Sequence, residues 1–249
     1  MHATMYRRFF LFLVLLMHLT VRGEPTLRLG TLNVPPYGEP DAQGRPSGAY
    51  TELLNAIVNA AGLQGSQALY PPKRLYALIQ HREVDLVLSS RSLDRDYGMI
   101  NLGTLSKMDG VIVYRDDRAE PRTLQDMSGD LIGRLGGTCP SLARAGMHLY
   151  DLSDLGQGLR MLQAGRLGGL CTETASLSMA AAADPKDIGH LRAFVFLSSD
   201  VWLFAQPQLS AATQNALRQA VVSVTQNGTA SRIMAKYRTL PLPLIRPAP

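Results

Sequence analysis

Strand-like and helix-like segments alternate along this chain, and no other feature constrains its fold as strongly. A first run has expected strands at Leu27–Leu32, Val84–Leu88 and Val111–Tyr114, and expected helices at Tyr50–Ala61 and Arg74–Gln80. A second run has expected strands at Leu131–Leu135, Leu167–Thr172, Phe194–Leu197 and Val201–Ala205, and expected helices at Leu155–Leu162, Ala211–Thr225 and Thr229–Tyr237. Such alternation predicts α/β layers in which helices cover a mostly parallel sheet. Ligands of these sheets bind beyond the carboxyl ends of the strands.

The first residues are typical of a secretory signal peptide. Arg7 and Arg8 precede the unbroken apolar run Phe9–Met17, and Val21 and Gly23 then occupy the small-residue positions of a cleavage site. The apolar run is shorter than the ~20 residues that cross a bilayer, although an uncleaved membrane anchor is the alternative interpretation. We therefore predict that residues 1–23 are removed and that the rest of the chain is exported to the periplasm.

Charge and histidine spacing give no sign of a nucleic-acid partner, a metal or a cofactor. The formal net charge of +5 falls once the three arginines of the leader are removed, which leaves 22 basic against 20 acidic residues. The chain lacks the basic cluster with interleaved aromatics that is typical of nucleic-acid binding. His81, His148 and His190 do not have the spacing of metal ligands. We expect no metal, no cofactor and no nucleic-acid partner.

Cys139 and Cys171 are the only two cysteines, and both follow the leader. Export permits a disulfide between them, whereas two separate buried thiols are the alternative. Because each lies at or near the carboxyl end of an expected strand, we predict that they approach each other. A bond between them would contribute about 2–4 kcal/mol to stability, and it requires Cα atoms no more than ~7 Å apart.

Four short motifs follow one another along the chain: Val34–Tyr37 (VPPY), Ser90–Arg95 (SRSLDR), Gly133–Thr138 (GRLGGT) and Asn227–Thr229 (NGT). In this order they resemble the bacterial family 3 extracellular solute-binding proteins, the periplasmic receptors typified by polar amino-acid transport. The likeness extends over Leu27–Tyr237.

The resemblance implies a two-lobed, periplasmic-binding-protein-like α/β fold that closes over a ligand by a hinge motion. Lobe 1 would be discontinuous, with residues 24–113 and 204–249, and lobe 2 would comprise residues 114–203. Val111–Tyr114 and Val201–Ala205 would be the two strands that cross between the lobes. The Pro-rich segment Leu240–Pro249 is expected to be a loose tail.

The resemblance also implies a ligand site in the cleft. Arg95 matches the family's carboxylate-binding position, and a guanidinium holds a carboxylate through two parallel donors. Thr138 follows two glycines at a strand end, where its hydroxyl and nearby backbone N–H groups suit the same carboxylate. Glu173 stands where the family usually has the Asp that binds the ligand's ammonium group. Tyr37 and Ser90, which belong to the matched motifs, complete the expected site.

Three of these residues also have ordinary structural interpretations. The alternative for Arg95 is an ion pair with Asp94 or Asp96 on the surface. Thr138 suits a plain turn, and Glu173 suits the first turn of a helix, where carboxylates interact with backbone donors.

Two departures from the family leave the ligand open. The aromatics that often sandwich the ligand are replaced by Val34 and Pro72. The element Pro71–Arg74 instead resembles a divergent branch with a Pro-x-x-Arg pattern, in which Arg74 would face the cleft. The alternative for Arg74 is a solvated residue at a helix start.

These observations favour a monomeric binding protein rather than an enzyme. Its ligand would be a small zwitterionic or anionic solute, an amino acid or a related organic acid, delivered to an ABC-type permease. The alternatives are an orphan or sensory receptor and a dehydratase-like enzyme on the same scaffold, with Glu173 as general acid. In the binding protein, Arg95 and Glu173 are expected to face each other from opposite lobes, and loss of either is expected to weaken binding by ~2–5 kcal/mol.

Overall fold

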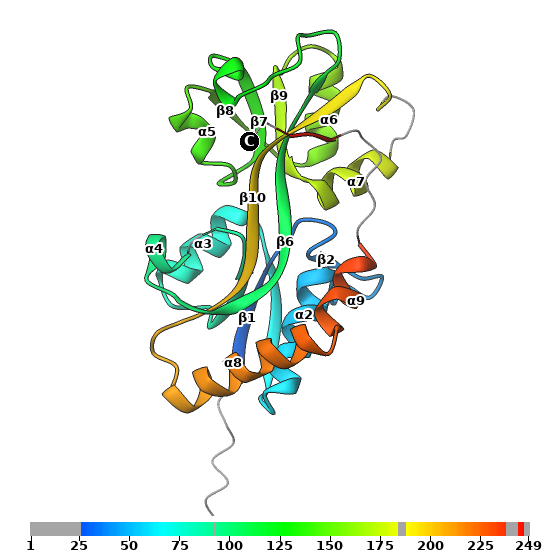
Figure 1. Ribbon diagram of the computed structural model, residues 1–249. Coiled ribbons are helices and arrows are strands. Elements are labelled where there is room, and N and C mark those ends of the chain that lie inside the picture. The colour runs from blue at the N-terminus through cyan, green and yellow to red at the C-terminus, as the bar shows by residue number, and fades with distance from the viewer. Residues whose placement is uncertain (1–25, 92, 184–187, 238–243, 247–249) are drawn as a thin grey trace, which may run out of the picture.

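The structure, a computed structural model, describes residues 26–91, 93–183, 188–237 and 244–246. The expected leader and its cleavage site lie outside these residues. Two α/β lobes are stacked on each other, and two long strands, β6 (Ile100–Arg115) and β10 (Leu191–Ala205), run through both (Figure 1). The predicted two-lobed α/β class is confirmed.

The sheet is parallel within each lobe and antiparallel where the long strands meet. In lobe 1, β1 (Leu27–Leu32) lies between β4 (Gly65–Tyr70) and β5 (Leu86–Ser89), parallel to both. In lobe 2, β7 (Leu131–Leu135) lies between β8 (His148–Leu152) and β9 (Gly169–Glu173), again parallel to both. The long strands β6 and β10 are antiparallel neighbours, and they join the two halves into one mixed sheet of order β4-β1-β5-β10-β6-β9-β7-β8.

Helices cover the sheet in both lobes, and local sequence signals set where several of them begin. Those of lobe 1 are α2 (Ala49–Ala60), α3 (Pro72–Gln80), α4 (Leu93–Tyr97), α8 (Ala211–Gln226) and α9 (Thr229–Ala235). Those of lobe 2 are α5 (Ser141–Arg144), α6 (Leu155–Gln163) and α7 (Thr174–Ala183), and the short 3-10 helix Leu124–Met127 precedes β7. Asp154 and Ser210 cap α6 and α8, because each side chain accepts a hydrogen bond from a backbone N–H in the first turn. Pro72 opens α3, where its missing N–H costs nothing.

Separate hydrophobic cores fill the two lobes. Leu53 and Ile57 of α2 pack with Leu203 and Val221 in lobe 1. Val113, Leu162, Leu170 and Leu177 pack together in lobe 2. We keep the predicted boundaries as a proposal, with residues 24–113 and 204–249 in lobe 1 and 114–203 in lobe 2. Val113 and Leu203, which stand at these boundaries on the crossing strands, pack in the core of the other lobe.

The crossing strands are longer than expected. The sequence predicts two strands at Phe194–Leu197 and Val201–Ala205, separated by polar residues, but the structure has one strand, β10. Ser198, Ser199 and Asp200 pair with residues of β6 between the lobes, with register shifts on either side. Their side chains do not belong to either core, and hydrophobic periodicity therefore does not detect this part of the strand.

The C-terminal segment is also more ordered than expected over its described part. A short strand, β11 (Leu244–Ile245), pairs with β10, and Arg246 forms an ion pair with Asp109. The expectation of a loose tail over Leu240–Pro249 is therefore wrong for residues 244–246. A two-stranded hairpin, β2 (Glu39–Pro40) and β3 (Pro46–Ser47), occupies the turn-rich stretch before α2. Among the described residues, no helix is long and apolar enough to cross a membrane.

Candidate functional site

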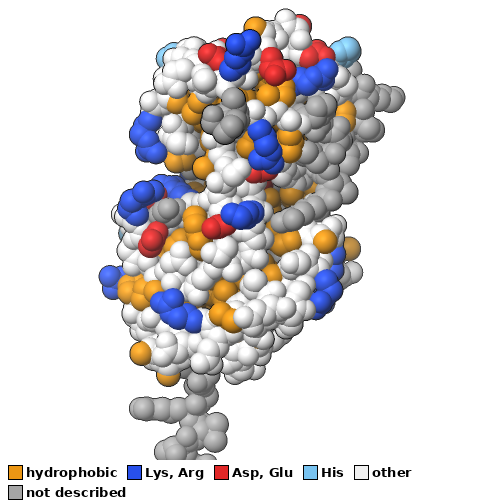
Figure 2. Space-filling view, in the orientation of Figure 1, with side chains coloured by type: hydrophobic (Ala, Val, Ile, Leu, Met, Phe, Trp, Pro, Cys, Tyr) orange, Lys and Arg blue, Asp and Glu red, His pale blue; other side chains and the backbone are white. Residues whose placement is uncertain are grey.

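A cavity of about 710 Å³ lies between the lobes, where the parallel strands of both end. Residues that follow β1, β5 and β7 and the last residues of β9 line it, which is the position that the strand order predicts for a ligand. On the face shown in Figure 2, basic and acidic side chains gather beside α4 at the narrow waist of the molecule. Five of the six predicted site residues line the cavity: Tyr37, Ser90, Arg95, Thr138 and Glu173. The sixth, Arg74, is exposed on α3 and does not line it.

Arg91 is the most firmly held cation of the lobe-1 wall, and the sequence patterns did not indicate it. Its Nε donates to Asp96 at 2.7 Å, and its guanidinium carbon lies 4.9 Å from the ring centre of Tyr76 and 5.4 Å from that of Tyr97. The two rings are stacked on each other, with centroids 5.9 Å apart. Only 30% of the Arg91 side chain is exposed. An arginine held by an ion pair and two aromatic faces is preorganised to bind an anion.

Arg95 is much freer than expected. It lies on α4 rather than directly at a strand end, and 79% of its side chain is exposed. Its nearest acid, Asp96, is 3.9 Å away and is already bound by Arg91. Arg144 of α5 is a further exposed cation on the cavity wall, from the opposite lobe.

Glu173 ends β9 and brings a carboxyl group into the cavity from lobe 2. Ser176, one turn into α7, contacts one of its oxygens, and the Thr172 hydroxyl lies 3.4 Å from the other. Burial raises the pKa of the Glu173 carboxyl above its usual value, and these hydrogen bonds only partly oppose the shift. None of the ion pairs among the described residues involves Glu173.

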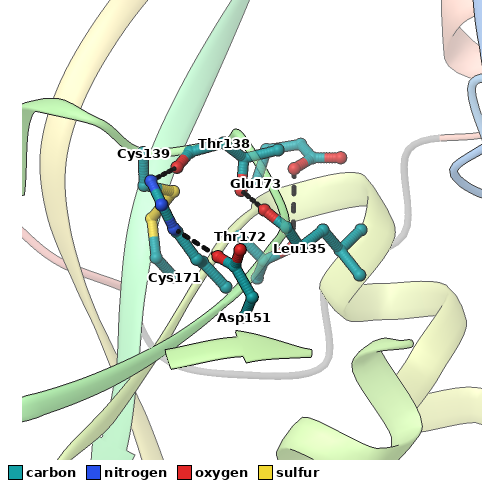
Figure 3. The surroundings of a disulfide bond; sticks show 8 residues. Leu135, Thr138, Cys139, Asp151, Cys171, Thr172 and Glu173 are labelled. Atoms are coloured by element: carbon teal, nitrogen blue, oxygen red, sulfur yellow. Dashed lines mark hydrogen bonds and ion pairs between the residues drawn. A yellow bond between two sulfur atoms is a disulfide. The ribbon is translucent and has the colours of Figure 1, made fainter. Parts of the chain in front are cut away.

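Thr138 is tied into its own turn in this conformation. Its hydroxyl and its backbone N–H both donate to the carbonyl of Leu135, at 2.7 and 3.0 Å, and its own carbonyl accepts from Arg134 (Figure 3). The hydroxyl expected to bind a carboxylate is therefore engaged within the loop. Thr138 here shapes the cavity wall.

A disulfide joins this loop to the neighbouring strand. Cys139, which follows Thr138, is bonded to Cys171 in β9, with Cα atoms 6.6 Å apart (Figure 3). The predicted approach of the two cysteines is confirmed. Both cysteines line the cavity, so the bond fixes the ends of β7 and β9 relative to each other beside Glu173.

Aromatic side chains supply much of the cavity's apolar surface. Tyr37 and Tyr50, whose ring centres are 4.4 Å apart, lie on the lobe-1 side, and Tyr76, Phe196 and Trp202 also line the cavity. Burial raises the pKa of Tyr50 and of Tyr76, so both phenols stay neutral. Tyr37 belongs to the predicted site, whereas comparison with the family's usual aromatic positions does not find Tyr50, Tyr76, Phe196 and Trp202. Pro72 replaces one of the family's usual aromatics, and Tyr76 lies one helical turn after it on the same face of α3. This spacing is the sequence signal that indicates Tyr76.

Polar contacts join the two lobes beside the cavity. Lys73 of α3 donates to Asp151 at the end of β8, at 2.6 Å, and Arg134 of β7 binds the same carboxylate. The second contact joins the Ser176 hydroxyl of α7 to the carbonyl of Pro35, at 2.6 Å. A Cβ on Gly136 would lie 3.0 Å from Lys73 Cε, so this glycine permits the close approach. The structure therefore has its lobes in contact around the cavity.

The described residues include no group of three or more His, Cys, Asp or Glu that could hold a metal ion. The cavity wall presents guanidinium groups, the carboxyl groups of Asp96 and Glu173, hydroxyls and aromatic rings.

No protein-family model matches the chain, and no curated protein matches it by sequence. Solved structures do match. An ancestral arginine-binding protein bound to arginine has a TM-score of 0.70 at 17% identity, over 88% of this chain and 100% of that chain. The GluR0 ligand-binding core from Nostoc punctiforme in complex with L-glutamate has a TM-score of 0.69 at 16% identity, over 85% of this chain and 98% of that chain. A histidine kinase sensor domain with similarity to periplasmic binding proteins has a TM-score of 0.70 at 18% identity, over 88% of this chain and 98% of that chain. At such identities the likeness establishes the fold, which is the two-lobed fold of periplasmic binding proteins.

Proposed function

We propose that this chain is a periplasmic solute-binding protein that captures a small zwitterionic or anionic solute, an amino acid or a related acid, for a membrane transporter. The cavity between the lobes carries the proposal, because charged and aromatic side chains from both lobes enclose it. A ligand that contacts both walls stabilises the closed arrangement of the lobes, and such coupling is how two-lobed proteins bind by hinge closure. The fold is shared with proteins whose structures hold arginine or glutamate.

The binding site in this proposal consists of the five predicted residues that line the cavity, together with Arg91. Arg91 and Arg95 attract the acidic end of the solute from lobe 1. Glu173 contributes a carboxyl group from lobe 2, and Tyr37, Ser90 and Thr138 form parts of the wall. Arg74 is not included, because it does not reach the cavity.

A thermal-shift screen of the mature chain tests the proposal. Amino acids, mono- and dicarboxylates and polyamines are added singly, and a ligand of the native state raises stability by about 2.7 kcal/mol at a concentration of 100 Kd. Titration calorimetry with that ligand is then expected to give a stoichiometry of one site per chain. Chromatography of the solute recovered from the protein is expected to show that it is chemically unchanged, as for a binding protein. Chemical conversion of the solute would favour the dehydratase-like alternative, and no stabilisation by any compound would contradict the proposal.

Export is tested separately by mass spectrometry of the protein from a periplasmic extract. We expect an N-terminus at Glu24 and no retained membrane-bound form. An intact Met1, or quantitative recovery in the membrane fraction, would contradict export by a cleaved leader.

A sensory role is the second candidate, and the similarity to a histidine kinase sensor domain favours it. The two roles differ in what happens when the gene is deleted. A transporter component is required for uptake of its radiolabelled solute, whereas loss of a sensory receptor leaves uptake intact and changes the response to the solute.

A further inference from the structure

Ser176 links the buried carboxyl group of Glu173 to closure of the lobes. Its hydroxyl oxygen lies 2.6 Å from the Pro35 carbonyl of lobe 1 and also contacts Glu173 Oε1. A backbone carbonyl has no hydrogen to donate, so the Ser176 hydroxyl must be the donor to Pro35. A serine hydroxyl has only one hydrogen. Because that hydrogen is directed to Pro35, the contact with Glu173 is satisfied when a protonated Glu173 supplies the second hydrogen.

The protonation state of Glu173 follows from this count. A protonated Glu173 donates to the Ser176 oxygen, and Ser176 donates to Pro35, so that every group in the chain is satisfied. An ionised Glu173 would compete with Pro35 for the single Ser176 hydrogen and would weaken the contact between the lobes. The raised pKa of the Glu173 carboxyl agrees with the protonated form.

In the part of the chain that the structure describes, no cation forms an ion pair with Glu173. Its neighbours are the hydroxyls of Thr172 on β9 and Ser176 on α7, and the neutral phenols of Tyr50 on α2 and Tyr76 on α3 are the titratable groups that interact with it. The positive charges of the cavity wall are Arg91, Arg95 and Arg144, and the other acid of the wall, Asp96, is bound by Arg91.

We propose that the solute of this cavity is a carboxylic acid with an apolar body and no ammonium group, and that Glu173 stays protonated beside it as a hydrogen-bond donor to Ser176. The inference rests on the proposed function and narrows its substrate class. A cavity with three arginines and one ion-paired acid attracts an anion. The rings of Tyr76, Phe196 and Trp202 suit an aromatic or branched aliphatic body. An ammonium group would have no ionised partner unless it displaced the proton from Glu173.

Matched pairs of compounds test this inference directly. Titration calorimetry at pH 7 compares 3-phenylpropanoate with L-phenylalanine, 4-methylpentanoate with L-leucine, and glutarate with L-glutamate. Each pair has the same body and differs by the ammonium group. In the pair whose body fits, we expect the acid to bind about tenfold or more tightly than the amino acid, since each pKa unit of proton displacement costs a factor of ten.

Two variants at one position identify the role of Glu173. Glu173→Ala is expected to weaken binding of the acid about tenfold, because Ser176 loses its donor in a buried place. Glu173→Gln restores a neutral donor, so we expect it to recover most of that loss. The affinity of the wild-type protein for the acid is expected to fall as the pH rises through the raised pKa of Glu173 and its carboxyl group ionises, and in Glu173→Gln this dependence on pH is lost.

The outcomes separate this inference from the proposed function. If an amino acid binds more tightly than its matched acid and Glu173→Gln abolishes that binding, the ligand is zwitterionic and the inference is wrong, although the binding function stands. If the acid binds with the same affinity in wild type, Glu173→Ala and Glu173→Gln at every pH, the role of Glu173 is wrong. If no member of any pair binds, and the wider screen is also negative, the proposed function itself fails.

Discussion

The lobe-1 wall of the cavity is held by an ion pair and stacked rings, whereas the lobe-2 wall is held by a disulfide and by hydroxyl hydrogen bonds. In lobe 1, Asp96, Tyr76 and Tyr97 fix the guanidinium of Arg91. In lobe 2, the bond between Cys139 and Cys171 fixes the ends of two strands beside the carboxyl group. The lobe-1 wall presents the permanent charge of Arg91, and the lobe-2 wall presents, beside the exposed Arg144, a carboxyl group whose pKa is raised by burial.

This difference assigns separate tasks to the two walls. A charge that cannot be removed at physiological pH attracts and orients an anion before the lobes meet. A neutral acid contributes little to attraction over a distance, and it matters only once the cavity has closed around it. Binding energy is therefore expected to depend on Arg91, and the pH dependence of closure on Glu173.

Removal of Arg91 is expected to weaken binding more than any other single substitution in the two walls. Arg91→Ala removes the cation that binds Asp96 at 2.7 Å and leaves Asp96 only the exposed Arg95 at 3.9 Å, and we expect a loss of about 2–5 kcal/mol in the free energy of binding. Arg91→Lys is expected to lose much of this as well, because an ammonium group neither stacks on the faces of aromatic rings nor binds bidentately. Titration calorimetry with the solute found in the screen measures both.

Arg95 and Arg74 provide matched arginine controls for this prediction. Arg95→Ala is expected to cost no more than about 1 kcal/mol, because its side chain is 79% exposed. Arg74→Ala removes an exposed arginine outside the cavity and is expected to bind like wild type. If Arg95→Ala weakens binding more than Arg91→Ala, the anchor is Arg95, as the family resemblance implies.

Loss of the disulfide is expected to lower the stability of the folded protein without changing the charges of the cavity wall. Cys139→Ser with Cys171→Ser opens a covalent loop with a sequence separation of 32 residues, and we expect about 2–4 kcal/mol less stability in urea. A reductant should destabilise the wild-type protein to a similar extent and leave the double variant unaffected. Equal stability of wild type and double variant under oxidising conditions would show that hydroxyl contacts alone hold the lobe-2 wall.

Glu173 is expected to give the stability of the protein a particular dependence on pH. Its folded-state pKa is raised above its usual value of 4.5 by burial. Below that pH the carboxyl group is protonated in both the folded and the unfolded chain, and its contribution to the free energy of unfolding is fully present. As the pH rises toward the folded-state pKa, only the unfolded chain ionises, so this stability is lost. Urea denaturation of wild type and Glu173→Gln is expected to show a difference in favour of Gln that grows with pH and then levels off.

A carboxyl group with the opposite shift serves as the control. Hydrogen bonds from the backbone N–H groups of Thr123 and Arg122 lower the pKa of Asp126. The contribution of Asp126 to stability is present above its usual pKa of 3.8 and is lost as the pH falls. Asp126→Asn should therefore be less stable than wild type above this pH, and the difference should disappear as the pH falls. A pH profile of Glu173→Gln that resembles that of Asp126→Asn would contradict a raised pKa at Glu173.

The sequence predicts the buried elements of this fold well and its edges poorly. Leu27–Leu32 and Leu131–Leu135 are strands with the predicted bounds, because each is the apolar centre of a parallel sheet. The strands β4 and β8, which lie at the two ends of the sheet, were not predicted. Their sequences, GSQALY and HLYDL, mix exposed polar residues with apolar ones and have no continuous hydrophobic run.

The candidate site was predictable in its location and less so in its members. Strand ends and short motifs indicate the region that contains Thr138 and Glu173, and both line the cavity. The choice between Arg91 and Arg95 depends on which guanidinium lies against Tyr76 and Tyr97, and these tyrosines come from different helices. The proton on Glu173 depends on the Pro35 carbonyl, which is 141 residues from Ser176. Contacts between residues so far apart in the sequence form only in the complete fold, and local sequence patterns do not predict them.

The ion pair between Lys73 and Asp151 is expected to have the smallest effect, and it tests whether the walls are also coupled outside the cavity. Lys73→Gln removes the lobe-1 partner, while Arg134 continues to hold Asp151 within lobe 2. Because the Lys73 side chain is 69% exposed, we expect binding to weaken by only about 0.2–1 kcal/mol. The difference from wild type should shrink between about 0.01 and 1 M salt, since salt screens exposed charges. Lys236→Gln is the matched control, because Lys236 pairs with Glu52 at the same distance of 2.6 Å but entirely within lobe 1. If both variants weaken binding equally, the effect comes from stability of lobe 1, and the contact of Lys73 with Asp151 contributes nothing to closure.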